Sequence, residues 1–422
     1  MKMEISVLTS LRKNLLTFSF ATFAFVCTDI AFAVPDIGTP VIALKQNCGS
    51  NQNCFTDATA LLNWAWGTRQ PTVNNPLVVE IDPGQYTVPG STCDASDIPG
   101  SGYVTFRGAG RDNTVLTGGA PGFGVIGVTG CKQLNFQDLT IRTGTLSSVG
   151  TSQIGIIWTG GGSSTWTNIK VEASYSAWYD SLASGATCAS TAGGRHEWYA
   201  SNLKTTNGSS MTGYQSICGD NWIWGSEILV LNNGGSNTGT SYTVGVGAQG
   251  TGGRVHLYGT DVRVLTTVNA TSSSPQMIGL AAEGGIIHIH GGEISVRSEN
   301  PNITQNVTGA SSTGAGGLVH TNDTSFGLLA SQNGVASRVV TANGGKVDAP
   351  FQWAAGTQPP NGNPSSSNNL VSSNGQDMFI ETDCGATGCH QAGNETHLLI
   401  YNNACVTSGP WFDVVTGKCR GL

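Results

Sequence analysis

Charged residues are scarce in this chain, and their scarcity excludes several functions. Lys, Arg, Asp and Glu make up 11% of 422 residues, against about a quarter in an ordinary globular domain. No cluster of Lys or Arg is present and the net charge is −7, so we expect neither nucleic acid nor an anionic membrane surface as a partner. Residues typical of helical proteins are also scarce, whereas 10 Trp, 13 Phe and 9 Tyr argue against disorder.

A long apolar run is lacking everywhere except near the N-terminus. Arg12 and Lys13 precede the apolar run 15–26, and small residues follow at Ala31 and Ala33. This pattern is typical of a secretory signal peptide over residues 1–33, because the run is too short to cross a bilayer. We therefore expect a mature chain 34–422 that is secreted, extracellular or periplasmic, soluble and monomeric.

Cysteine usage fits an oxidising compartment. The chain has 11 cysteines, and loss of Cys27 with the signal leaves an even number. Local disulfides are expected within 48–54, 384–389 and 405–419, which leaves Cys93, Cys131, Cys188 and Cys218 for longer links. A zinc site at Cys384 and Cys389 with His390 and His397 is the less favoured alternative, since thiols in such a compartment usually pair with each other.

Glycine is abundant, at 59 residues, and it punctuates short β-branched or aromatic runs that recur along the chain. The recurring unit is an alternating strand, a polar corner and a second alternating strand. If the residue after each corner is taken as an anchor, the anchors are separated by 30, 34, 25, 34 and 32 residues; they are Leu139, Ile169, Leu203, Ile228, Val262 and Ile294. Such spacing predicts an all-β fold, a parallel β-helix of stacked coils over residues 76–350.

Polar residues are expected to share the corner between the two strands of each coil. They are Asp138, Asn168, Asn202, Glu227, Asp261 and Glu293. Because Asn and Asp commonly bond to turn backbone, we interpret this row as structural rather than catalytic.

Both ends of a solenoid need covering. Residues 34–75 should form an N-terminal cap with a helix at 54–66, where apolar residues recur at helical spacing. Residues 351–422 should form a C-terminal Cys-containing cap or tail. Between these ends, the stretch 299–324 is rich in Asn, Ser, Thr and Gly and contains three glycosylation sequons, which predicts a long surface loop.

Three segments together resemble the pectinesterases, or pectin methylesterases. Residues 79–86 resemble their early strand ending in Gly-x-Tyr, 104–116 resemble the following glycine-containing strand, and 136–141 match the next coil. The resemblance covers roughly 78–264, nearly half of the mature chain. It implies a right-handed parallel β-helix of the pectin-lyase type and an enzyme that hydrolyses the methyl esters of pectin-like polymers in a cell wall.

The same resemblance suggests catalytic positions, with departures. Gln153 matches the oxyanion-binding glutamine, and Asp180 matches the general acid/base although Tyr179 stands where a second glutamine is expected. Asn221 occupies the nucleophile position, with Asp220 one residue earlier. Since neighbouring strand residues face opposite sides, Asp220 can replace the nucleophile only if a bulge re-aims it. The arginine element of the family has no clear counterpart; by position only, the candidates are Arg254, Arg263 and Arg297.

In the mechanism that the resemblance implies, one carboxylate attacks the ester carbonyl and the other protonates the departing methanol. Four aromatic residues near these positions, Trp178, Tyr179, Trp222 and Trp224, are expected either to stack against sugars or to pack within the solenoid.

Two other functions stay open. One is a catalytically degenerate β-helix that binds glycan without changing it, which Asn221 favours. The other is a polysaccharide lyase, which is disfavoured because no carboxylate cluster for calcium is visible. His288 and His290 share a strand face and could hold a metal, but strand alternation produces such pairs by default, so we expect neither metal nor cofactor.

Overall fold

The computed structural model describes residues 41–348, apart from 52, 91, 95–101, 119–123, 145–152, 182–193, 207–210, 234–242, 271–275 and 332–335, and strands between 353 and 420. The chain divides into two units, Met1–Thr39 and Pro40–Leu422. The expected signal peptide, 1–33, lies outside the described residues. Within the part that is described, no helix is both long and apolar enough to cross a membrane.

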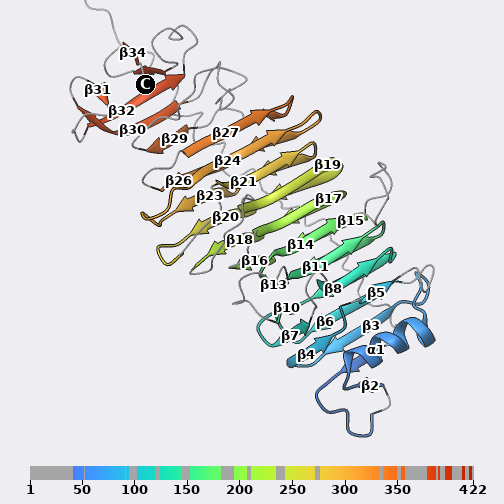
Figure 1. Cartoon of the computed structure of the whole chain (residues 1–422). Coiled ribbons are helices and arrows are strands. Elements are labelled where there is room, and N and C mark those ends of the chain that lie inside the picture. Colours follow the sequence, from blue (N-terminus) through green and yellow to red (C-terminus); the bar gives the residue numbers. More distant parts are fainter. Residues whose placement is uncertain are drawn as a thin grey trace, which may run out of the picture. The chain divides into compact units, whose positions relative to one another are not determined.

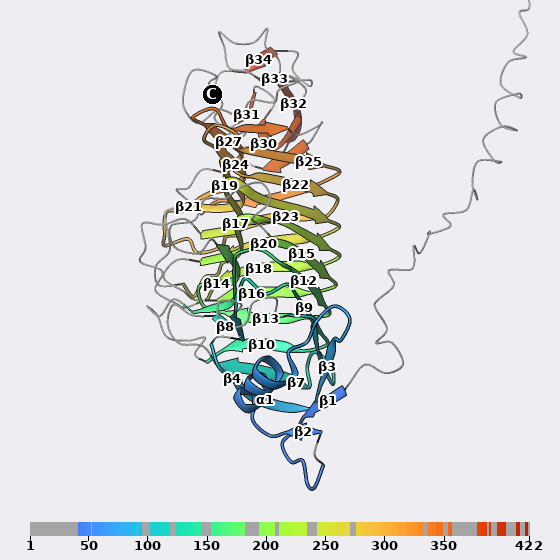
Figure 2. The ribbon, with the colours of Figure 1, turned by 90° about the vertical axis from the view of Figure 1, so that its right-hand side faces the viewer.

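The second unit is built almost entirely of strands in a right-handed parallel β-helix, as predicted (Figure 1). Each coil visits three columns of strands in turn, and Figure 2 shows the columns side by side. Columns 1 and 2 belong to one hydrogen-bonded sheet, because the long strands β17 (Met211–Trp224) and β19 (Thr243–Tyr258) bend from column 1 into column 2.

The remaining strands fall into these columns. Column 1 also contains β5 (Cys93–Asp94), β8 (Gly124–Thr129), β11 (Ile154–Thr159), β14 (Ser176–Ser181), β21 (Gln276–Glu283), β24 (Asn306–Thr313) and β27 (Ala336–Ala342). Column 2 also contains β1 (Val41–Leu44), β2 (Cys54–Phe55), β3 (Leu77–Ile81), β6 (Val104–Gly108), β9 (Gln133–Gln137), β12 (Ser163–Thr167), β15 (Gly194–Tyr199), β22 (Ile286–His290), β25 (Leu318–Asn322) and β28 (Lys346–Asp348). Column 3 is a separate sheet of β4 (Gly84–Val88), β7 (Thr114–Gly118), β10 (Thr140–Thr143), β13 (Lys170–Ala173), β16 (Asn202–Thr206), β18 (Glu227–Asn232), β20 (Asp261–Thr266), β23 (Glu293–Ser298) and β26 (Ser325–Leu329).

A further sheet lies near the C-terminus. It consists of β29 (Trp353–Gly356), β30 (Met378–Gly385), β31 (Gly388–Cys389), β32 (Glu395–Tyr401), β33 (Trp411–Asp413) and β34 (Lys418–Arg420). Unlike the coils, most of its strands pair antiparallel, and Cys384 lies opposite Cys389 in the ladder.

The expected register is wrong by two residues in the first coils. Leu203 pairs with Val171, and Val171 pairs with Ile141, so the anchors Leu139 and Ile169 were placed too early. The corner row divides accordingly. Asp138 and Asn168 have left-handed backbone (φ 54° and 53°) at the corner itself, whereas the other four polar residues begin the strands of column 3.

Later coils place glycine at this left-handed corner position. Gly225, Gly259 and Gly291 have φ between 53° and 68° and continue the row of Asp138 and Asn168. Either residue class suits a left-handed position, because Gly lacks a Cβ and Asn or Asp bonds locally. The side chains of Asp138 and Asn168 bond each other at 2.6 Å, which supports their structural interpretation.

The core runs inside the coils and is stacked from matching side chains. Phe106, Phe136, Trp166 and Trp198 form one continuous aromatic stack from column 2, with ring centroids 4.3–4.9 Å apart. Trp178 packs against this stack from column 1 and is fully buried. Apolar burial of this kind supplies about 25 cal/mol per Å², so the stack stabilises every coil that it crosses.

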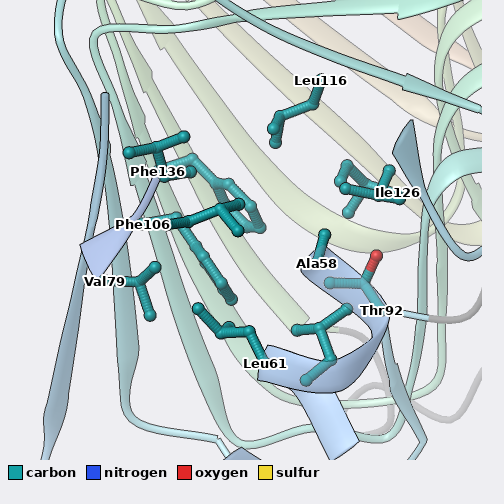
Figure 3. A pocket seen from close by; sticks show the side chains of 12 residues that line it. Ala58, Leu61, Val79, Thr92, Phe106, Leu116, Ile126 and Phe136 are labelled. Carbon is teal, nitrogen blue, oxygen red and sulfur yellow. The ribbon is translucent and has the colours of Figure 1, made fainter. Parts of the chain in front are cut away.

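The N-terminal helix is shorter than expected. Helix α1 (Ala58–Trp64) begins after Asp57, whose carboxylate accepts the backbone N–H of Ala60, and a π-helical turn η1 (Ala65–Arg69) follows. Leu61 and Leu62 are buried among core residues of the first coils. An apolar cavity of about 20 Å³ lies between the helix and the core residues Val79, Phe106 and Phe136 (Figure 3).

One expected local disulfide is present, two of the four cysteines left for longer links pair with each other, and one expected loop is absent. Cys48 bonds Cys54, Cys93 bonds Cys131, and Cys218 is disulfide-bonded as well. The prediction of a surface loop over 299–324 is wrong, because β24 and β25 occupy half of it. Small polar residues fit there because the Ser and Thr side chains of β24 are mostly buried between neighbouring strands.

Candidate functional site

Asp180 lies inside the solenoid, beneath the bend of β17. Its side chain is 1% exposed. Its Oδ1 accepts the backbone N–H groups of Ile217 and Cys218, both at 2.7 Å, where the register of β17 shifts. Asp180 therefore holds the bend that carries the chain from column 1 into column 2.

Asn221 completes this buried polar network. Its Nδ2 donates to Asp180 Oδ2 at 2.9 Å and to Ser216 Oγ at 2.9 Å, and its Oδ1 accepts the hydroxyl of Tyr214 at 2.6 Å. Burial raises the pKa of Asp180 to about 6, although bonds from Cys218, Asn221, Ser216 and Ile217 oppose that rise. Both carboxylate oxygens of Asp180 thus accept bonds from protein donors, as expected of a structural network.

Gln153 is not brought to this pair. It immediately precedes β11, whereas Asp180 is level with Trp158 in that strand. At about 3.3 Å per residue, a difference of five positions separates them by roughly 16 Å along the strand. The expectation that Gln153 donates to an oxyanion beside Asp180 is therefore wrong.

Asp220 faces away from Asp180. Asn221 points inward and its neighbour Asp220 points outward, with a side chain 39% exposed. No bulge re-aims Asp220, because β17 pairs regularly with β15 from Gly219 to Trp224. The two expected carboxylates thus lie on opposite faces of the sheet, as strand alternation dictates.

The aromatic residues divide in the same way. Trp178 is buried in the core, so of its two expected roles it packs within the solenoid and does not stack on a sugar. Tyr179 is half-buried on the outer surface of column 1, where burial chiefly raises its pKa. Trp222 and Trp224 lie on the outer face of column 2 beside Asp220.

This outer face carries two rows of residues in register across five coils. Residues directly opposite in adjacent strands fall into the same row. We call these ten residues the outer ladder; they are Glu197, Trp222, His256, His288 and His320 in one row, and Tyr199, Trp224, Tyr258, His290 and Asn322 in the other.

Rings of the outer ladder stack on one another. Trp224 lies between Tyr199 and Tyr258, with centroids 4.8 and 5.8 Å away. Trp222 has His256 on one face at 4.2 Å and the guanidinium of Arg195 over its ring at 5.0 Å. Because neighbours lie against their faces, Trp222 and Trp224 present mainly their edges outward, which leaves little room for a sugar to stack on either ring.

A hydrogen bond joins His256, at the centre of the outer ladder, to Asp220. His256 Nε2 lies 3.1 Å from Asp220 Oδ1, and Trp222 Nε1 donates to Asp220 Oδ2 at 2.8 Å. Burial alone would raise the pKa of Asp220, but these bonds and the charges of His256 and Arg195 lower it overall. Asp220 is thus held ionised against the imidazole.

The three candidate arginines lie in different places. Arg263 pairs with Glu227 and Asp261 on column 3, and Arg297 pairs with Glu299 there. Arg254 lies in register with Asp220 on column 2 and precedes His256 by two residues. Only Arg254 therefore shares a face with one of the expected carboxylates.

Four histidines gather on the outer ladder, yet their geometry is one of stacked rings. His256 and His288 are parallel with centroids 5.1 Å apart, and His320 follows at 5.7 Å. Among the described residues, no group of three or more His, Cys, Asp or Glu is arranged to hold a metal ion.

Sequence reasoning missed Tyr199, His256 and Tyr258. A signal for them is present in the sequence: paired positions i and i+2 recur just before each corner, with separations of 25, 34, 32 and 32 residues. Aligning the coils on the strand before the corner, rather than the strand after it, would have revealed the rows.

Two buried groups should give opposing pH dependences of stability. Burial lowers the pKa of His196 from 6.5 to about 3, and burial raises that of Asp180 from 3.8 to about 6. Between pH 4 and 6, unfolding takes up a proton at His196 and releases one at Asp180, so their contributions to the slope cancel.

Replacing His196 by glutamine should remove that cancellation. Asp180, with its raised pKa, contributes stability that is present at low pH and is lost as pH rises. The free energy of unfolding of His196→Gln should therefore fall between pH 4 and 6, by at most about 1.4 kcal/mol per pH unit. Urea unfolding at several pH values measures this slope, with His290→Gln, a half-buried histidine on the outer face, as the control. If the free energy of unfolding of His196→Gln did not change between pH 4 and 6, the raised pKa of buried Asp180 would be contradicted.

Comparison with solved structures finds matches of low identity and low TM-score. A pectin methylesterase variant in complex with a hexasaccharide is 11% identical with a TM-score of 0.34, and the alignment covers 79% of this chain and 94% of that one. The Geobacillus virus E2 protein ORF18 is 10% identical with a TM-score of 0.36, covering 87% and 72%. The A-module of mannuronan C-5 epimerase AlgE4 from Azotobacter vinelandii is 13% identical with a TM-score of 0.26, covering 71% and 95%.

Sequence comparison adds no relative. No protein-family profile matches the chain, and no curated protein does. Pectin methylesterases, which the sequence motifs resemble, are thus among the matched structures. Matches at this identity and TM-score assign no role to any residue.

Proposed function

We propose that this protein binds a polysaccharide chain along the outer ladder. The observation that carries the proposal is the register of ten aromatic, imidazole and polar side chains on five successive coils. Stacked coils repeat similar contacts at the strand spacing of about 4.8 Å. A repeating polymer can use such equivalent contacts, whereas a single small molecule would use one or two.

The chemistry of the outer ladder suits sugar hydroxyls. Ring edges offer the Tyr258 hydroxyl and the imidazole nitrogens of His288 and His290, while Glu197 and Asp220 offer carboxylate oxygens. Such mixed donors and acceptors match a ligand made of hydroxyl groups. With a net charge of −7, the chain should prefer a neutral polymer such as methyl-esterified pectin to free polyuronate.

Hydrolysis of pectin methyl esters by Asp180 and Asp220 is not supported by their geometry. Asp180 is buried with its oxygens bonded to the bend of β17, and Asp220 lies on the other side of the sheet. A two-carboxylate mechanism needs both groups within reach of one reacting centre. A binding protein is therefore preferred to an esterase that uses this pair.

The proposal also includes export and a monomeric state. The disulfides Cys48–Cys54 and Cys93–Cys131 favour an oxidising compartment, in agreement with the signal peptide expected at 1–33. In this proposal the mature chain acts outside the cytoplasm and one protomer presents the complete outer ladder.

Calorimetric titration of the purified, oxidised mature chain tests the proposal. Highly methyl-esterified pectin should bind more tightly than polygalacturonate, and affinity should increase with oligomer length until the coils of the outer ladder are spanned. Methyl galactoside should compete poorly. The absence of binding to these polymers and to a neutral glucan, or full competition by the monosaccharide, would contradict the proposal.

A further inference from the structure

We propose that His256, positioned by Asp220, is a general base that hydrolyses ester groups on the polymer held at the outer ladder. The inference rests on the proposed function, because the polymer must first bind there. It replaces the buried pair Asp180 and Asn221 with groups that a substrate can reach.

The two nitrogens of His256 have different roles. Nε2 faces the Asp220 carboxylate at 3.1 Å, so it carries the proton of this hydrogen bond. Nδ1 has no hydrogen-bond partner among the described residues, and the side chain of His256 is 18% exposed. The nitrogen without a partner is thus the one with the lone pair, as a general base requires.

The imidazole is held rigidly. Its ring lies between Trp222 at 4.2 Å and His288 at 5.1 Å, and Trp222 Nε1 fixes the second oxygen of Asp220. A base whose own position is fixed by packing and hydrogen bonds loses less entropy when a substrate reacts.

The charges around His256 suit a developing oxyanion. Arg254 is exposed, forms no ion pair with a described residue, and lies in register with Asp220. Arg195, on the other neighbouring strand, already pairs with Glu197 at 2.7 Å. His288 remains uncharged at neutral pH because burial, chiefly, and the surrounding cations lower its pKa to about 4. Arg254 is therefore the free cation available to a negative oxygen.

One imidazole can carry the proton through the whole reaction. His256 Nδ1 removes a proton from water while the water oxygen bonds to the ester carbon, giving a tetrahedral oxyanion beside Arg254. When the carbon–oxygen bond to the alcohol breaks, the imidazolium returns that proton to the departing oxygen. The products are a carboxylic acid, which ionises in solution, and an alcohol, so no oxidant or cofactor is needed.

Cleavage of glycosidic bonds fits the same face less well. Glycoside hydrolysis commonly needs one carboxyl kept protonated beside an ionised one. Here the pKa of Asp220 is lowered, and Glu197 is bonded to Arg195 and to the Tyr199 hydroxyl. The proton that a poor sugar leaving group requires has no evident donor among these carboxyls, whereas ester hydrolysis needs only the imidazole.

Methanol release from highly methyl-esterified pectin, measured beside pectin binding, tests the inference. His256→Gln should lower the rate by about 10²- to 10⁴-fold while binding persists, and Asp220→Asn should also lower it. Thr165→Ala, on the same face but outside the outer ladder, is the matched control and should retain activity. Added imidazole should restore part of the rate in His256→Gly, which a purely structural role would not allow.

The outcomes separate the two proposals. Unchanged methanol release in His256→Gln, or a wild-type chain that binds pectin and releases none, would overturn the catalytic inference and leave the binding function standing. Absence of pectin binding would overturn the function itself. Products with the ultraviolet absorbance of unsaturated uronates would overturn the hydrolytic assignment in favour of elimination.

Discussion

Replacing Asp180 by alanine is expected to lower the free energy of unfolding by about 3–5 kcal/mol. The change leaves the backbone N–H groups of Ile217 and Cys218 and one donor of Asn221 without their acceptor. Each buried unsatisfied donor costs about 1–3 kcal/mol, and water cannot reach the bend of β17 without opening the coil. Urea unfolding followed by tryptophan fluorescence measures the loss.

The matched control is Asp220→Ala, on the opposite face of the sheet. Its hydrogen bonds, to Trp222 and His256, are partly exposed, so the loss should be about 1 kcal/mol or less. If Asp180→Ala kept wild-type stability but lost methanol release, Asp180 would have to be a catalytic group, and the interpretation of its network as structural would be wrong.

The double substitution of Trp222 and Trp224 by alanine should weaken pectin binding by at least about 30-fold, the loss of roughly 2 kcal/mol expected for central aromatic residues of a binding surface. Their rings hold His256, Tyr258 and the guanidinium of Arg195 in place, so their removal disturbs several contacts at once. Titration with the same pectin measures the change.

Two controls make this result specific. Thr165→Ala, on the same outer face but upstream of the outer ladder, should bind as wild type does. Trp224→Phe keeps a ring between Tyr199 and Tyr258 and should retain most of the affinity. Unaltered binding by the double variant, with its fold intact by circular dichroism, would place the polymer elsewhere on the molecule.

The solenoid could be predicted from the sequence because each coil is locally encoded. Inward residues such as Ile141 and Val171 alternate with polar ones, and the same pattern returns after about thirty residues. The predicted alignment of the early coils is off by two residues because the positions one and three residues after the corner are both apolar, as at Ile169 and Val171. In β24 the alternation is hidden, since buried Ser and Thr take the places of apolar residues.

The candidate site was harder to predict because it depends on which way each side chain points. Asp180 and Asn221 do contact each other, but inside the solenoid. They meet there because β17 crosses the corner without a loop and its bend needs a buried hydrogen-bond acceptor. His256 was missed because its partner Asp220 belongs to the preceding coil, 36 residues earlier. Such a pairing emerges only when coils with loops of unequal length are aligned strand by strand.

The same left-handed glycine corner recurs at Gly225, Gly259 and Gly291, so the coils between these corners have equivalent ends. The segments from Gly225 to Gly259 and from Gly259 to Gly291 begin and end in the same backbone conformation, and each adds one rung to both rows of the outer ladder. Duplicating or deleting one such segment should lengthen or shorten the polymer-binding surface by one unit without redesigning its neighbours. The number of coils therefore determines how many binding units this surface offers to the polymer.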